Sequence, residues 1–393
     1  MKKESLIYHG AINVSLYVLK AQYIVTLIYL ICYPHAITSI NRAVGYALIA
    51  VQIVSVIYSV IDSIVNNEVN CTLLTICGIV LALLSTDVRI RDVNMALQNI
   101  TGFIFIISFM EMQKNIKPDK ELSKFIARIV LISSVVFLVY SRMPFAYNVE
   151  TQDLYLEKTA LTLGYSNPNG IAMLLLFFLI MVLIFARNKQ FKKGTAIALC
   201  VEYLYLIYQT KSRAVLVAAV FLLIMNMVTV KNIPKWMFWF SVGVPLVSIT
   251  LLPYLKDIGF MDGQDFLGKA LYSGREKMFR QRLDYLRDAL DWAFGNIGRG
   301  LFKNHHNGFL SILLSSGICG VAVFVYSLAK NALVYFRGMN RTSYMAVCGI
   351  LAVLLHSSAE AGFVVGAVPY SIGLITLLIY IRFEEEEHEA PAH

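Results

Sequence analysis

Apolar stretches about as long as a membrane-crossing helix recur along the whole chain, and they limit what it can fold into. A helix needs about 20 predominantly apolar residues to cross a bilayer. Stretches of roughly this kind lie at residues 13–32, 43–61, 71–86, 93–110, 125–140, 169–186, 195–210, 213–230, 236–253, 307–329, 343–356 and 364–381. Of the 393 residues, 58% are hydrophobic and only 15% are charged, which excludes a soluble globular domain. We expect an all-α polytopic membrane protein with about twelve transmembrane helices, forming a single transmembrane domain over residues 1–393.

Basic side chains in the short loops predict which way the helices run, because such loops stay in the cytoplasm. If the spans alternate, the basic loops around 114–124, 187–193, 231–235 and 330–341 face the same side. Both termini then lie in the cytoplasm. Residues 62–70, which would be cytoplasmic without a positive charge, fit the scheme less well, as do Arg89 and Arg91, which would lie outside.

The largest connection, residues 254–305, joins the ninth and tenth predicted helices and would face outward. Within it, apolar residues recur at helical spacing, at Phe279, Leu283, Leu286 and Leu290. This pattern predicts an amphipathic helix that lies on the outer membrane surface or caps a cavity. The loop is also rich in Arg and Lys despite facing outward, which argues for an anionic ligand on that side.

Several common kinds of site are not indicated. The six cysteines lie in or beside apolar spans without a CxxC pair, so neither a structural disulfide nor a zinc site is expected. Asp262 and Asp265 are interpreted as a solvated turn rather than a metal site. The chain has no P-loop and no dinucleotide fingerprint. We expect no cofactor, no metal and no nucleic-acid partner. The first span follows Lys2 and Lys3 without a cleavage site, so it should remain as a helix.

Polar motifs follow one another in a fixed order through the second half of the chain. They are Tyr165-Ser166-Asn167-Pro168-Asn169-Gly170, Thr210-Lys211-Ser212-Arg213, Ser273-Gly274-Arg275, Gly298-x-Gly300, His306-Asn307-x-x-Leu310, Gly317-Ile318-x-Gly320, and His356 with Glu360 and Gly362. Over about 165–365 this order resembles the O-antigen ligase and Wzy-type polysaccharide polymerase superfamily, membrane glycosyltransferases of the GT-C kind. The resemblance rests on order, spacing and outward placement, because no single motif is specific. Many relatives carry an acidic residue where this chain has Ser315-Ser316.

The resemblance implies a metal-independent reaction on a lipid-linked glycan at the outer face of the bacterial cytoplasmic membrane. Members transfer a glycan from undecaprenyl pyrophosphate to an acceptor hydroxyl. Their functional pair of arginines and histidine correspond by motif to Arg213, Arg275 and His306. The expected partners are the lipid-linked oligosaccharides that serve as donor and acceptor, the lipid bilayer, and the chain-length regulator and flippase of the same pathway.

The chemistry of the residues supports these roles independently. Breaking a sugar–pyrophosphate bond places negative charge on the leaving phosphate, and without a metal a cationic side chain must meet it. Arg suits this task because its planar fork holds two phosphate oxygens and stays charged. A histidine can accept the proton of the attacking sugar hydroxyl.

Each of these residues also has a plain structural alternative. Arg213 could be an interface anchor, Arg275 a solvated loop charge, and His306 a hydrogen-bonding partner of a neighbour. Asn307 is expected to cap the following helix. His356 and Glu360, one helical turn apart, could pair with each other or contribute to the acceptor side. Further candidates for phosphate or glycan contact are Lys211, Arg280, Arg282, Arg299 and Asn169.

Three functions stay open. The first is a polymerase that joins lipid-linked repeat units. The second is a ligase that delivers the glycan to lipid A–core or another acceptor by the same chemistry. The third is a transporter of lipid-linked or anionic solutes, since many carriers also have about twelve helices. A carrier should show internal repeats and charges near the bilayer midplane, whereas here the charges collect at one face. This disfavours a carrier. The motifs do not separate polymerase from ligase, since both face the same pyrophosphate and need the same base, and the polymerase is kept as the first hypothesis.

Overall fold

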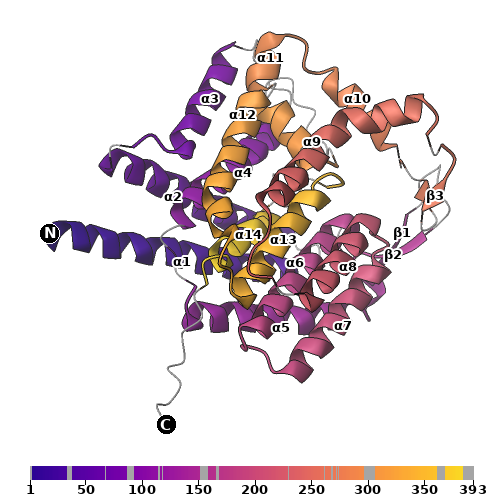
Figure 1. The fold of residues 1–393 in the computed structure, drawn as a ribbon, viewed down its shortest axis with the longest axis horizontal. Coiled ribbons are helices and arrows are strands. Elements are labelled where there is room, and N and C mark those ends of the chain that lie inside the picture. Colours follow the sequence, from indigo (N-terminus) through magenta and orange to yellow (C-terminus); the bar gives the residue numbers. More distant parts are fainter. Residues whose placement is uncertain are drawn as a thin grey trace.

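A computed structural model describes residues 2–32, 38–66, 68–85, 93–113, 116, 118–150, 158–164, 168–228, 230–260, 262–266, 269–270, 272, 274–295, 306–360 and 368–383. Helices dominate this part of the chain (Figure 1). The α-helices are α1 (Lys2–Cys32), α2 (Thr38–Val65), α3 (Cys71–Ser85), α4 (Val93–Met112), α5 (Lys120–Tyr140), α6 (Pro168–Arg187), α7 (Lys193–Gln209), α8 (Arg213–Met227), α9 (Lys235–Asp257), α10 (Arg275–Leu283), α11 (Ala289–Phe294), α12 (Gly308–Ala332), α13 (Arg341–His356) and α14 (Val368–Tyr380). Two short 3-10 helices are η3 (Pro144–Ala146) and η5 (Leu333–Phe336).

Strands are few and short in the described residues. β1 (Tyr147–Glu150) pairs antiparallel with β2 (Lys158–Leu161), and β3 (Asp265–Phe266) pairs with β4 (Lys269–Ala270). The first pair sets Tyr147 opposite Leu161. β1, β2 and β3 gather at one edge of the molecule (Figure 1).

The described helices overlap every predicted span, which confirms the all-α, membrane-embedded class. Among the described residues, the segments long and apolar enough to cross a membrane are Val14–Cys32, Lys120–Tyr140, Pro168–Arg187, Lys235–Asp257 and Gly308–Phe336. Shorter apolar helices account for other predicted spans, for instance Arg213–Met227 and Arg341–His356. The number of twelve crossings stays a prediction, as does the side on which each terminus and the 254–305 loop lie.

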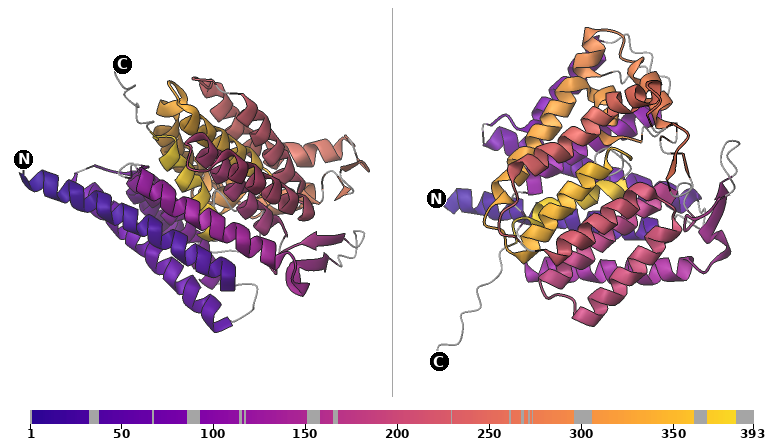
Figure 2. Two further views of the ribbon diagram at one scale, coloured as in Figure 1. Left: turned by 90° about the horizontal axis from the view of Figure 1, so that it is seen from below. Right: turned by 45° about the vertical axis from the view of Figure 1, so that its right-hand side comes forward.

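Helix α6 forms the centre of the bundle. Every residue from Ile171 to Phe185 is at most 4% exposed, so this helix is apolar around its whole circumference. It packs against α5, α7, α8 and α13. Helices α12 to α14 lie between α1–α4 on one side and α5–α8 on the other (Figure 1), and α1 runs beside α5 (Figure 2, left).

Helix α12 reverses direction at Gly317, where the backbone has φ 64° and ψ −167°. A straight helix would separate residues 309 and 324 by about 22 Å along its axis. Instead, the rings of Phe309 and Phe324 touch edge to face, with centroids 5.8 Å apart. Residues 308–316 and 318–332 are therefore two arms folded against each other. The expectation of one uninterrupted span over 307–329 does not hold at this point.

The turn of α12 packs tightly, backbone against backbone, on the end of α11. A Cβ on Gly317 would lie 2.3 Å from the carbonyl carbon and oxygen of Ala293, and a Cβ on Gly295 would lie 2.4 Å from the Ser316 nitrogen. Both glycines have positive φ, and both permit a backbone approach that no side chain allows.

The amphipathic helix predicted around 279–290 is divided into α10 and α11. Asp288 caps α11, because its carboxylate accepts hydrogen bonds from the backbone N–H groups of Leu290 (3.0 Å) and Asp291 (2.9 Å). Phe279 and Leu286 are buried as the pattern predicts, but Leu290 is 48% exposed. Helix α10 packs along α9, and its first residue lies at the cavity described next.

Candidate anion-binding site

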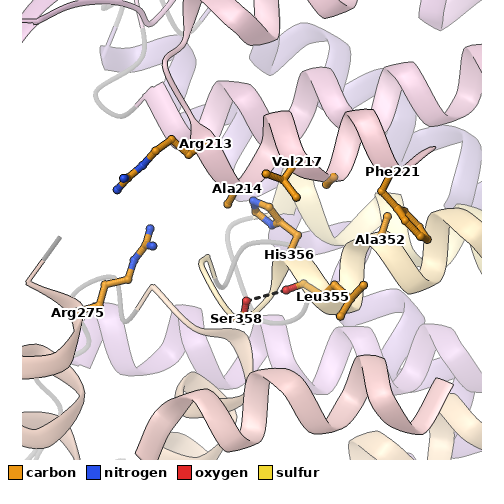
Figure 3. A pocket seen from close by; sticks show the side chains of 10 residues that line it. Arg213, Ala214, Val217, Phe221, Arg275, Ala352, Leu355, His356 and Ser358 are labelled. Carbon is orange, nitrogen blue, oxygen red and sulfur yellow. Dashed lines mark hydrogen bonds between the residues drawn. The ribbon is translucent and has the colours of Figure 1, made fainter. Parts of the chain in front are cut away.

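A cavity of about 370 Å³ lies between α8, α13 and the start of α10. Its lining includes Arg213, Ala214, Val217, Ala218, Phe221, Arg275, Ala352, Leu355, His356 and Ser358. Figure 3 shows the guanidinium groups of Arg213 and Arg275 reaching from opposite sides into the same open space, with the His356 ring farther along the cavity, next to Ala214. The cavity thus has a cationic end and an apolar floor formed by α8 and α13.

Arg213 is placed by a tight turn between α7 and α8. The Thr210 hydroxyl donates to the Ile207 carbonyl (2.7 Å) and accepts from the Ser212 backbone N–H (3.3 Å). Both side chains are buried, so the turn is fixed from within. Arg213 follows as the first residue of α8. Lys211 is exposed, lies outside the cavity lining, and holds its ammonium group 4.5 Å from the Tyr208 ring centre.

Arg275 is the first residue of α10. Gly274 precedes it with φ 75° and ψ 4°, a left-handed conformation that glycine adopts without strain and that turns the chain into the helix. Burial lowers the pKa of Arg275, and the negative charge of Glu360 opposes that effect. An arginine pKa starts so high that the guanidinium stays charged at neutral pH. The cavity therefore holds a cation from each of two separate elements.

A histidine–carboxylate pair adjoins the cationic end. His306 Nδ1 lies 2.7 Å from Glu360 Oε1. The Asn169 amide donates to the same oxygen at 2.8 Å. Glu360 is 2% exposed. Burial alone would raise its pKa, but the hydrogen bond and charge of His306, with the charges of Arg275 and His356, hold it below the usual value. The carboxylate is therefore ionised near neutral pH.

Asn307 anchors the segment that carries His306. It is fully buried, and its side-chain oxygen accepts from the Leu310 backbone N–H (2.9 Å), which is the predicted helix cap. Its amide donates to the Pro245 carbonyl (2.9 Å) and the Ser248 hydroxyl (3.1 Å) of α9. The Gly308 N–H also donates to the Ser357 carbonyl at 2.8 Å. These contacts tie His306 to the end of α13, where Glu360 lies.

The structure thus brings together six of the residues selected from the sequence: Arg213, Arg275, His306, His356, Glu360 and Asn169. Of these, Arg213, Arg275 and His356 line the cavity itself, whereas Arg280 and Arg282, like Lys211, do not. Arg280 pairs with Asp257 at the end of α9, and the Arg282 guanidinium lies 5.6 Å from the Tyr285 ring centre. The first contact joins α10 to the end of α9, and the second is local to the end of α10. Arg299 lies outside the described residues.

The role of Glu360 as the partner of His306 was not foreseen. The sequence left open whether Glu360 pairs with His356 one turn earlier or contributes to the acceptor side. Helix α13 ends at His356, the chain then turns, and the carboxylate lies 2.7 Å from His306 Nδ1. The available signal was the ionisable residue itself, which is rarely placed beside an apolar span without a function or a partner.

No protein-family model and no curated protein matches this sequence. Within the described residues, no group of three or more His, Cys, Asp and Glu side chains is arranged to hold a metal ion. The fold and the site define an all-α membrane protein with a cavity that presents two arginines beside a histidine–carboxylate pair.

Proposed function

We propose that this protein is a bacterial membrane glycosyltransferase, a polymerase that transfers an undecaprenyl-pyrophosphate-linked glycan to a hydroxyl of an acceptor lipid-linked repeat unit. The reaction would take place at the outer face of the cytoplasmic membrane. The observation that carries the proposal is the pair of guanidinium groups facing one cavity, together with His306 bonded to Glu360, whose charge interacts with Arg275.

The two arginines would bind the pyrophosphate of the donor. Two cations in a partly desolvated cavity attract a dianionic group strongly, and their planar forks can each hold two oxygens. As the bond between the sugar C1 and the phosphate oxygen breaks, the electron pair stays on the pyrophosphate. Arg213 and Arg275 would stabilise that growing charge.

His306 would act as the general base. The acceptor hydroxyl oxygen forms a new bond to C1 of the donor sugar, and its proton passes to the imidazole. The donor glycan is then joined to the acceptor and separated from the donor's lipid pyrophosphate. The proton stays on His306 until it is released to water. The atoms and charges balance without a metal or another reactant.

The apolar floor supports a lipid substrate. Val217 lines the cavity and is also 58% exposed, so the cavity wall is open at the side of the bundle next to α8. Ala218, Phe221 and Leu355 extend the floor away from the arginines. A ligand that fits both ends has an anionic head and a hydrocarbon tail. Free sugar phosphates would leave the apolar part unused.

A ligase remains the second candidate, because it faces the same pyrophosphate and needs the same base. A transporter is supported less well. The described ionisable groups of the cavity lie at one end of it, beside the polar ends of α8, α10 and α13, rather than along a path through the bundle.

The test is a reconstitution in liposomes with an undecaprenyl-pyrophosphate oligosaccharide as sole substrate, with products separated on a gel. A polymerase gives a ladder of repeats, which Arg213→Ala, Arg275→Ala and His306→Ala should each abolish while the protein stays folded. Transfer that begins only after lipid A–core is added would identify a ligase. Wild-type ladders from all three variants would overturn the site assignment.

A further inference from the structure

We infer that Glu360 and Asn169 are positioning residues that set the tautomer of His306, so that Nε2 is the basic atom presented to the substrate. The inference rests on the proposed function and deepens it. It follows from the contacts of one oxygen of the Glu360 carboxylate, which both His306 and Asn169 reach. Asn169 lies at the start of α6, His306 just before α12 and Glu360 just after α13.

The first step concerns the proton on His306. An ionised carboxylate can only accept hydrogen bonds, so the nitrogen that faces it must donate. Glu360 is ionised because its pKa is lowered, as described above. His306 Nδ1, 2.7 Å from Glu360 Oε1, therefore carries the hydrogen. In the neutral ring the lone pair is then on Nε2, and the ring can accept a proton only there.

The second step concerns what holds the carboxylate. A buried carboxylate is costly unless donors satisfy it. Asn169 supplies one through its amide, and it is the second residue of α6, a helix that is buried around its whole circumference from Ile171 to Phe185. Asn169 thereby connects the carboxylate to the rigid centre of the molecule. Through this hydrogen bond Asn169 would act on the reaction by way of Glu360.

The third step concerns the backbone of His306 itself. This residue has φ 48°, a conformation that is strained for a residue with a side chain. The Asn307 cap and the bond from Gly308 to Ser357 hold the backbone there. With backbone and Nδ1 both fixed, the direction of Nε2 is determined. When Nε2 takes the proton of the acceptor hydroxyl, Glu360 stabilises the resulting imidazolium and keeps its own charge.

The experiment compares Glu360→Gln and Asn169→Ala with wild type. Glutamine keeps the shape of the side chain but presents an amide that can face the ring with either its oxygen or its NH₂. We expect kcat to fall about 100-fold in Glu360→Gln and about 10-fold in Asn169→Ala. KM and the binding of undecaprenyl pyrophosphate should change less than threefold, since the arginines are intact. Matched controls are Glu121→Gln and Asn66→Ala, both at exposed positions.

A second measurement does not depend on activity. Nitrogen-15 NMR of histidine-labelled protein distinguishes the two tautomers, and the His306 signal is identified by its loss in His306→Ala. Wild type should show Nδ1–H, and Glu360→Gln should show a mixture. In a His306→Ala background, neither substitution should lower the residual rate further.

The outcomes separate the inference from the proposed function. An unchanged tautomer in Glu360→Gln, or additive losses with His306→Ala, would overturn the positioning role while leaving a His306-dependent transferase in place. A changed tautomer in a protein that never extends a glycan would support the positioning role and overturn the proposed reaction.

Discussion

At the scale of single residues, the site depends on side chains whose charge and direction are fixed by neighbours. Arg213 and Arg275 begin two different helices, so each side chain leaves its helix at the first turn and reaches into the cavity. A helix N-terminus carries partial positive charge as well. An anion between these residues would therefore be attracted both by the two guanidinium groups and by the positive ends of α8 and α10.

The planar fork of these arginines should matter beyond their charge. Arg213→Lys and Arg275→Lys keep the cation but lose bidentate contact, so we expect glycan extension to fall about 10- to 100-fold. Alanine at either position should cost about 1,000-fold. Initial rates of gel-resolved extension measure this. Lys211→Ala, which removes a cation outside the cavity lining, is the matched control. Full activity with lysine at both positions would contradict a bidentate role.

The Glu360 carboxylate predicts a pH dependence of stability. Its pKa in the folded protein lies below the ordinary glutamate value of 4.5, because His306, Arg275 and His356 together outweigh burial. A group with a lowered folded pKa stabilises the protein above its unfolded pKa, and this contribution is lost as the pH falls through the folded value. The wild type should therefore have a higher Tm than Glu360→Gln at neutral pH, and this difference in Tm should become smaller below about pH 4.5. A difference that grows in acid would contradict the assignment.

At the scale of elements, the reversal of α12 places His306. The first arm is short and almost wholly buried, and its far end is closed by the contact between Gly317 and α11. A substitution at the turn therefore acts at a distance on the histidine at the other end of the arm. The same contact joins the connection between α9 and α12 to the bundle.

Gly317→Ala should destabilise the protein by about 3 kcal/mol or more, since it adds a clash with backbone to a positive φ. Thermal unfolding in detergent, followed by tryptophan fluorescence, measures the loss. Gly243→Ala in α9 is the control, because a Cβ there meets nothing within 4 Å and alanine favours a helix. Equal Tm values for both variants would contradict the tight turn.

The folded-back arms predict a specific cross-link. With the six native cysteines replaced by serine, Phe309→Cys and Phe324→Cys together should be joined by a short bifunctional maleimide, because the two rings are in contact and the reagent spans the space that they fill. Both positions lie in one tryptic peptide, because no Lys or Arg falls between them, so the mass of that peptide shows whether the two cysteines are joined. Phe309→Cys paired with Tyr326→Cys, whose partner side chain is exposed, is the control. A straight α12 would give no cross-link in either case.

At the scale of the whole molecule, the hydropathy pattern predicts the helices well because burial in lipid or in the bundle leaves few alternatives to an apolar helix. The sequence also predicts features that depend only on neighbouring residues, such as the Asn307 helix cap. What the sequence could not supply was geometry between distant residues. The contact of Glu360 with His306 and Asn169 depends on where α6 and α12 begin and where α13 ends. The bend of α12 depends on its contact with α11, and the spacing of apolar residues within α12 does not predict that contact.

The predicted orientation can be tested by labelling single cysteines with a membrane-impermeant maleimide. Lys211→Cys and Asp262→Cys, both exposed, should react in intact cells. Lys189→Cys and Arg337→Cys, also exposed, should react only after permeabilisation. The reason is the positive charge of the loops that carry residues 189 and 337. Labelling in the opposite order would invert the topology and move the cavity to the cytoplasmic side.

The exposed flank at Val217 has a consequence for how a substrate arrives. A ligand that enters past this residue diffuses in two dimensions and need never pass through water. Its effective concentration is then set by its mole fraction among the lipids and not by the volume of the sample. Rates measured in liposomes should therefore fall when the substrate is diluted in the membrane with inert phospholipid. A bulky side chain in place of Val217 would block the entry of the lipid tail into the cavity.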